Sequence, residues 1–133
     1  MNLREREDKI NQHLPIWIAL SAFYLDTELD NTELDRITSV FFQSKLTLNQ
    51  IKEIDLFEVF PTLQSNLSSV AGNWAGFDQK QLISACTKTL DKRDNFLFEN
   101  RVRLRNIFSF PMRRDYWKTV EQKYYALQSS SRP

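Results

Sequence analysis

Glycine occurs in one short block of this chain, and this restricts the folds that the chain can adopt. Gly72 and Gly76 both lie in the segment A-G-N-W-A-G-F at 71–77, and the rest of the chain contains none. The whole chain has four prolines. All-β folds need many tight turns, whereas helices joined by short loops need few glycines or prolines. Because ten Phe, four Tyr and three Trp supply a large apolar volume, the sequence predicts an all-α, single compact domain of six to seven helices with an aromatic-rich core.

Apolar residues recur at helical spacing along most of the chain. Thr32 is the expected N-cap of the second helix, and Thr47, with a glutamine three residues later, matches a capping box. Pro15 should end or kink a charged N-terminal helix, and Pro61 should end one helix or start the next. The predicted helices cover residues 16–24, 32–43, 47–60, 63–74, 78–90, 96–108 and 111–127, preceded by a weak, charged helix over 3–13.

The segment 96–108 is compatible with two kinds of secondary structure. Arginine alternates with apolar residues from 101 to 105, and this period of two favours a strand. Positions 97, 101, 104 and 108 have helical spacing instead. We prefer a helix, because a single strand would have no partner in this sequence.

The glycine block ends the most regular apolar stripe in the sequence. Leu63, Leu67, Val70 and Trp74 lie at i, i+4, i+7 and i+11, which is one face of a helix. Gly72 stands where a C-terminal cap is expected. The block is therefore predicted to be an architectural corner, whose structural residues are Gly72, Trp74, Gly76 and Phe77.

The sequence contains no recognisable set of catalytic residues. His13 is the single histidine and is expected on the surface, and Cys86 is the single cysteine and is expected in the core. A zinc site of the usual nitrogen and sulfur type is excluded, and no phosphate-binding glycine loop is present. The acids after Leu25 resemble the start of a calcium loop, but Asn31 and Ile37 occupy its essential glycine and glutamate positions. We therefore predict that the protein is not an enzyme and binds no cofactor and no metal. An enzymatic function would require a metal site built from carboxylates.

The charges are divided unevenly along the chain, although the net charge is only +1. Residues 1–87 carry 7 basic and 12 acidic side chains, whereas residues 88–133 carry 11 basic and 5 acidic ones. This asymmetry indicates either two solvated faces or two partner surfaces. The candidate partner-binding acids are Asp26, Glu28, Asp30, Glu33 and Asp35. The alternative basic site comprises Arg101, Arg103, Arg105, Arg113 and Arg114.

Two motifs resemble a family of small bacterial proteins classed as a domain of unknown function. They are W-x-A-L-S-x-F-x-L-D-T-E-L at 17–29 and E-V-x-P-x-L-x-x-N-L-x-x-V-A-G-x-W-A-G-F at 58–77. The resemblance covers residues 15–90 and implies a bacterial, cytosolic, helical domain with no known activity. Within a single domain over 1–133, residues 91–128 would then be a basic helical extension and 129–133 a frayed tail.

The expected function is protein binding without catalysis. A small bacterial protein with an acidic patch and no catalytic set is similar in general type to an immunity protein, which would neutralise a cognate toxin by occluding its active site. Its partner would carry a basic cleft facing the acidic cluster. The alternative is a nucleic-acid or regulatory binder that uses the basic C-terminal third, although a pI near 7.8 argues against nucleic acid. The charged N-terminus and the single cysteine indicate a cytoplasmic protein without a membrane span.

Overall fold

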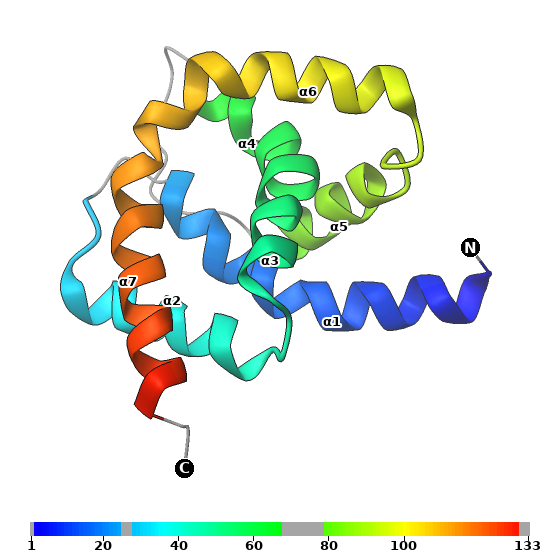
Figure 1. The fold of residues 1–133 in the computed structure, drawn as a ribbon. Helices are drawn as coiled ribbons and strands as arrows, with labels where there is room; N and C mark the ends of the chain where they lie inside the picture. Colours follow the sequence, from blue (N-terminus) through cyan, green and yellow to red (C-terminus); the bar gives the residue numbers. More distant parts are fainter. Residues whose placement is uncertain (1, 25–27, 68–78, 131–133) are drawn as a thin grey trace.

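The computed structural model describes residues 2–24, 28–67 and 79–130, and within these ranges the chain is helical and contains no strand (Figure 1). The predicted all-α fold is therefore confirmed, and the ambiguous segment 96–108 is a helix. The α-helices are α1 (Leu3–Ser21), α2 (Asn31–Gln43), α3 (Leu48–Ile54), α4 (Phe60–Leu67), α5 (Gln79–Leu90), α6 (Phe96–Ser109) and α7 (Arg114–Ser130). Three short elements link them: the 3-10 helices η1 (Ala22–Tyr24) and η3 (Phe110–Met112) and the π-helix η2 (Asp55–Val59).

The π-helix η2 lies at the centre of the packing. It continues α3 directly into α4, and α1, α5 and α6 all pack against it. Helices α2 and α7 lie side by side, and α6 runs along an outer edge, where its inner face contacts η2 and α4 (Figure 1). One apolar core joins these elements, and its aromatic members are Trp17, Phe23, Tyr24, Phe41, Phe57, Phe60, Trp117 and Tyr124.

Polar side chains start several of the helices by accepting backbone N–H bonds that the first turn leaves free. The predicted capping box at Thr47 is present, because its hydroxyl accepts from Gln50 N while the Gln50 side chain accepts from Thr47 N. The prediction for α2 was wrong. Asp30, not Thr32, is the N-cap, and its carboxylate accepts from Glu33 N at 2.9 Å. The N-cap thus lies two residues earlier than predicted.

Pro15 does not end the first helix, which runs unbroken from Leu3 to Ser21. A proline inside a helix removes one hydrogen bond and costs about 3 kcal/mol. His13 and Trp17 lie on either side of it, and both bond to the carboxylate of Glu58. These two contacts hold the helix against the core on each side of the proline, which offsets that cost.

Pro61 lies in the first turn of α4, as one of the two predicted arrangements required. It has no N–H to donate to the carbonyl of Phe57, and its ring would collide with that carbonyl in a regular α-helix. The preceding residues widen into the π-helix instead, and Phe60 N–H donates five residues back to Asp55. Pro61 thereby gives a physical reason for the position of η2.

The predicted corner at 71–77 lies outside the described residues, so Gly72, Trp74, Gly76 and Phe77 stay predictions. Among the described residues, the left-handed region is occupied by a lysine. Lys45, in the turn between α2 and α3, has φ 65°, where glycine is the commoner choice.

Candidate functional site

The π-helix places two carboxylates inside the core. Asp55 is 2% exposed and Glu58 is 0% exposed. They are three residues apart on the same short element, and each receives one arginine and one tryptophan indole. Burial of a charged carboxylate is costly unless hydrogen bonds and opposite charges replace the lost water. The partners of each carboxylate therefore decide whether the site is structural or reactive.

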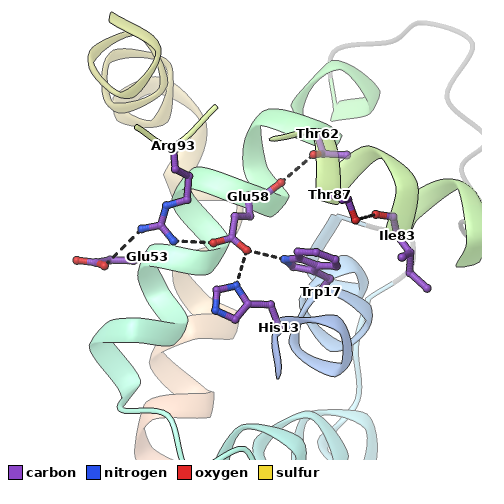
Figure 2. A network of polar contacts seen from close by, with 8 residues as sticks. All are labelled: His13, Trp17, Glu53, Glu58, Thr62, Ile83, Thr87 and Arg93. Atoms are coloured by element: carbon purple, nitrogen blue, oxygen red, sulfur yellow. Dashed lines mark hydrogen bonds and ion pairs between the residues drawn. The ribbon is translucent and has the colours of Figure 1, made fainter. Parts of the chain in front are cut away.

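Glu58 joins α1 to the segment after α5 (Figure 2). Its Oε1 accepts from Trp17 Nε1 at 2.8 Å and lies 2.7 Å from His13 Nδ1. Its Oε2 accepts from Arg93 Nη1 at 2.6 Å, and Arg93 also reaches Glu53 at 3.6 Å. The prediction that His13 lies on the surface was wrong: the ring is buried, because it takes part in this network.

Asp55 forms a parallel network with α7 and η1. Its Oδ1 accepts from the Tyr24 hydroxyl at 2.5 Å, and its Oδ2 accepts from Trp117 Nε1 at 3.0 Å and Arg113 Nε at 3.3 Å. Burial, followed by the neighbouring Asp55 charge, raises the pKa of Tyr24 well above its usual value. Tyr24 is therefore held as a neutral donor, and Asp55 has its acceptors occupied.

In both networks the buried carboxylates are paired within the fold. Every carboxylate oxygen of Asp55 and Glu58 already has a donor. Sequence reasoning missed both residues. The signal was present, because Asp55 and Glu58 interrupt an otherwise apolar run from Ile54 to Phe60.

The predicted basic site does not form one surface. Arg113 is 1% exposed, and its guanidinium lies within 5.4 Å of the rings of Tyr24, Phe60 and Phe110. It belongs to the core and is not available to a macromolecular partner, which corrects the sequence prediction. The other four arginines of the predicted site, Arg101, Arg103, Arg105 and Arg114, are exposed.

The predicted acidic site is partly used within the fold. Asp30 caps α2, and Asp35 receives Lys123 Nζ of α7 at 2.6 Å. Glu33 is half-buried, whereas Glu28 is exposed, and Asp26 lies outside the described residues. The carboxylates of Asp30 and Asp35 remain exposed, but each already stabilises a helix or a helix pair.

The outer face of α6 exposes large apolar side chains near both of its ends. Phe96, Leu97, Leu104, Ile107 and Phe108 are between 60% and 80% exposed, and we call them the α6 stripe. Their spacings of seven, ten and eleven residues return to one side of a helix. Val102, on the opposite side, is the buried contact of this helix. Phe96 and Phe108 both face solvent.

Other features limit the chemistry of the described part of the chain. Within it, no three His, Cys, Asp or Glu side chains gather closely enough to hold a metal ion, and no helix is long and apolar enough to cross a membrane. Cys86 is buried in the core as predicted. Burial raises the pKa of the Cys86 thiol to about 12, so the thiol is a poor nucleophile.

Residues 11–123 match the family described as Domain of unknown function (DUF7079), and the chain belongs to this family. The match includes the stretch 15–90, whose motifs carry the resemblance, and extends through α6 into α7. Comparison with the curated proteins and with the solved structures found no match. The description of the family names no activity, so the function has to be argued from the geometry.

Proposed function

We propose that this member of the DUF7079 family is a non-enzymatic protein-binding module, with the α6 stripe at the centre of its binding surface. The observation that carries the proposal is the exposure of five large apolar side chains on one helix face. Full burial of one such side chain contributes about 1.5–3 kcal/mol. An exposed apolar row of this kind marks an interaction site in a soluble protein.

The arginines of α6 complete a surface of the type found at protein interfaces. Arg101 and Arg105 are exposed and follow one flank of the stripe, and Arg103 follows the other. Arg103 also lies 4.9 Å from the ring of Phe57, which fixes its position against the helix. Interfaces commonly combine an apolar centre with aromatic and arginine residues and a charged rim. This combination supports a partner with an apolar ridge and acidic edges.

The finer proposal is an immunity protein of the bacterial cytoplasm that occludes the active site of a cognate toxin. It rests on the general resemblance in type and on the absence of an open catalytic set among the described residues. The single buried thiol, Cys86, suits a reducing compartment. Tight occlusion requires a surface that loses water on binding, and the α6 stripe supplies such a surface.

The acidic cluster is the second candidate surface for the same partner. It lies on and before α2, on the other side of the molecule from α6 (Figure 1). Asp30 and Asp35 already have partners, so a basic cleft would compete with a helix cap and with Lys123. The α6 stripe has no such prior role, and for this reason we favour it over the acids.

The test is co-expression of this chain with the product of the neighbouring gene. We expect a complex and protection of the host from that product. Leu104→Ser combined with Phe108→Ser should weaken the complex at least tenfold, which corresponds to about 1.4 kcal/mol. Tyr125→Ser, at an exposed aromatic on α7, is the matched control and should leave binding unchanged. If co-expression gives no complex and no protection, the immunity role is refuted. If the double variant binds as tightly as the native chain, the α6 surface is refuted.

Nucleic-acid binding is the alternative, and one observation favours it. Phe108 is exposed and lies three residues from the exposed Arg105 on α6, and such a pair can stack on bases while contacting phosphates. A titration with single-stranded DNA across salt concentrations tests it. Binding that weakens steeply as salt rises would support this alternative, whereas no binding or a flat log–log slope would eliminate it.

A further inference from the structure

A pocket of about 370 Å³ lies beside the buried Asp55 network, where α3, η2, the end of α6, η3 and the start of α7 meet. It is separate from the α6 stripe, and none of the five stripe residues lines it. Its lining residues are Lys52, Asp55, Leu56, Asn106, Phe110, Arg113, Arg114, Trp117, Lys118 and Glu121. Four of them are basic and two are acidic.

The two acids of the pocket are already neutralised by two of its bases. Asp55 is paired with Arg113, and Glu121 is paired with Lys52. Arg114 and Lys118 are exposed and form no ion pair with a described residue. They lie four residues apart on α7, so both charges project from the same side of the helix. The pocket therefore keeps two uncompensated positive charges.

The backbone and the floor of the pocket add further donors. Helix α7 begins at Arg114, and the N-terminus of a helix carries a partial positive charge and free N–H groups. The buried guanidinium of Arg113 uses Nε for Asp55 and Nη2 for Asn106, at 2.8 Å. Its Nη1 has no hydrogen-bond acceptor among the described residues. Arg113 lines the pocket together with Arg114 and Lys118, and an anion would supply the acceptor that its Nη1 lacks.

The apolar lining makes the pocket unsuitable for a bare inorganic ion. Leu56, Phe110 and Trp117 provide apolar walls. Trp117 is fixed in place, because its indole donates to Asp55 and its ring stacks on Phe41 with centroids 5.8 Å apart. A rigid apolar wall next to convergent polar groups is the usual form of a small-molecule site.

We propose that this pocket binds a small organic anion, namely a carboxylate attached to an apolar or aromatic body. The carboxylate lies toward Arg114, Lys118 and the start of α7, and the body lies against Trp117. The site requires no protein partner, so it goes beyond the proposed function and can be tested on the isolated chain.

The test uses benzoate as the probe and the tryptophan indole N–H signals in ¹⁵N-resolved NMR spectra as the readout. Trp117 lines the pocket, whereas Trp17 donates to Glu58 in the other network and serves as an internal control. We expect saturable movement of the Trp117 signal, with a dissociation constant of about 1 mM or tighter. The Trp17 signal should stay in place. Benzamide, which lacks the charge, and inorganic phosphate, which lacks the apolar body, should each bind at least tenfold more weakly.

Variants then separate the pocket from the general charge of the protein. Arg114→Gln with Lys118→Gln should weaken benzoate binding at least tenfold. Arg101→Gln with Arg105→Gln removes the same charge on α6 and should leave the binding unchanged. The proposal is overturned by a Trp117 signal that does not move, by equal binding of benzamide or phosphate, or by equal loss in both double variants.

Discussion

The substitution Glu58→Gln tests whether the buried network around the π-helix holds the helices together. Glutamine keeps the shape of the side chain but replaces one acceptor oxygen by an NH₂ donor. In the native protein Oε1 receives His13 and Trp17, and Oε2 receives Arg93. Whichever way the amide is turned, its NH₂ group then faces a donor instead of an acceptor partner. The variant thus removes the charge of Glu58 and leaves two hydrogen-bond donors facing each other at a position that is 0% exposed.

The expected cost follows from the burial of the pair. Removal of one partner from a buried ion pair costs about 3–5 kcal/mol. We expect the lower end, about 3 kcal/mol, because Arg93 keeps part of its exposure and can still reach Glu53. With a urea dependence of about 1.5 kcal/mol per molar, the midpoint of unfolding should fall by about 2 M.

Urea unfolding followed by circular dichroism at neutral pH measures this shift, and Glu53→Gln is the matched control. Glu53 faces the same Arg93, but its side chain is 63% exposed, so its loss should cost less than about 1 kcal/mol. Trp17→Phe removes a single donor to Glu58, and its loss of unfolding free energy should lie between those of Glu58→Gln and Glu53→Gln. Equal midpoints for Glu58→Gln and Glu53→Gln would refute the reasoning, since burial would then make no difference.

Three further predictions concern the core and α6. Native Cys86 should react with a thiol reagent at pH 8 about a thousandfold more slowly than the unfolded chain, because a pKa of about 12 leaves very little thiolate. The raised pKa values of Tyr24 and Cys86 mean that the folded state retains protons that the unfolded chain releases. Stability should therefore fall as the pH rises above about 9, and a flat profile up to pH 11 would contradict this. Val102→Ala should cost about 1.5–2 kcal/mol in thermal or urea unfolding, whereas Leu104→Ser should change stability by less than about 0.5 kcal/mol.

Local features of the fold could be predicted from the sequence because they depend on neighbouring residues. The capping box at Thr47 requires only a partner three residues away. The apolar spacing predicted α5 with Cys86 on its buried face. The position of Pro61 limited where α4 could begin. The N-cap of α2 was misplaced because Asp30 and Thr32 are both good caps, and local chemistry alone does not choose between them.

The buried networks could not be predicted, because their partners are far apart in the chain. His13 and Glu58 are 45 residues apart, and Asp55 and Trp117 are 62 apart. Periodicity gives the face of a helix on which a residue lies, but it does not give the residue that meets it. An isolated histidine in a charged segment looks solvent-exposed until the carboxylate opposite it is known.

The same limitation applies to α6. Its sequence has apolar residues on two faces, with Val102 on one and Leu104 on the other. Helical spacing identifies both faces but does not say which one has a neighbour. The structure covers the Val102 face with η2 and α4 and leaves the other to solvent. The Leu104 face of α6, which the fold leaves exposed, is therefore the face available for binding.

The charges of α6 restrict what can cover that face. Glu99 is its single acid, against Arg101, Arg103 and Arg105, so α6 carries a net positive charge. Two copies of the chain that paired through their α6 stripes would bring these arginines together, and the repulsion would oppose the apolar gain. A partner with acidic residues beside an apolar ridge would gain both from apolar contact and from attraction to these arginines. The burial of Arg113 strengthens this argument, because it leaves α6 with the largest group of exposed arginines in the predicted basic site.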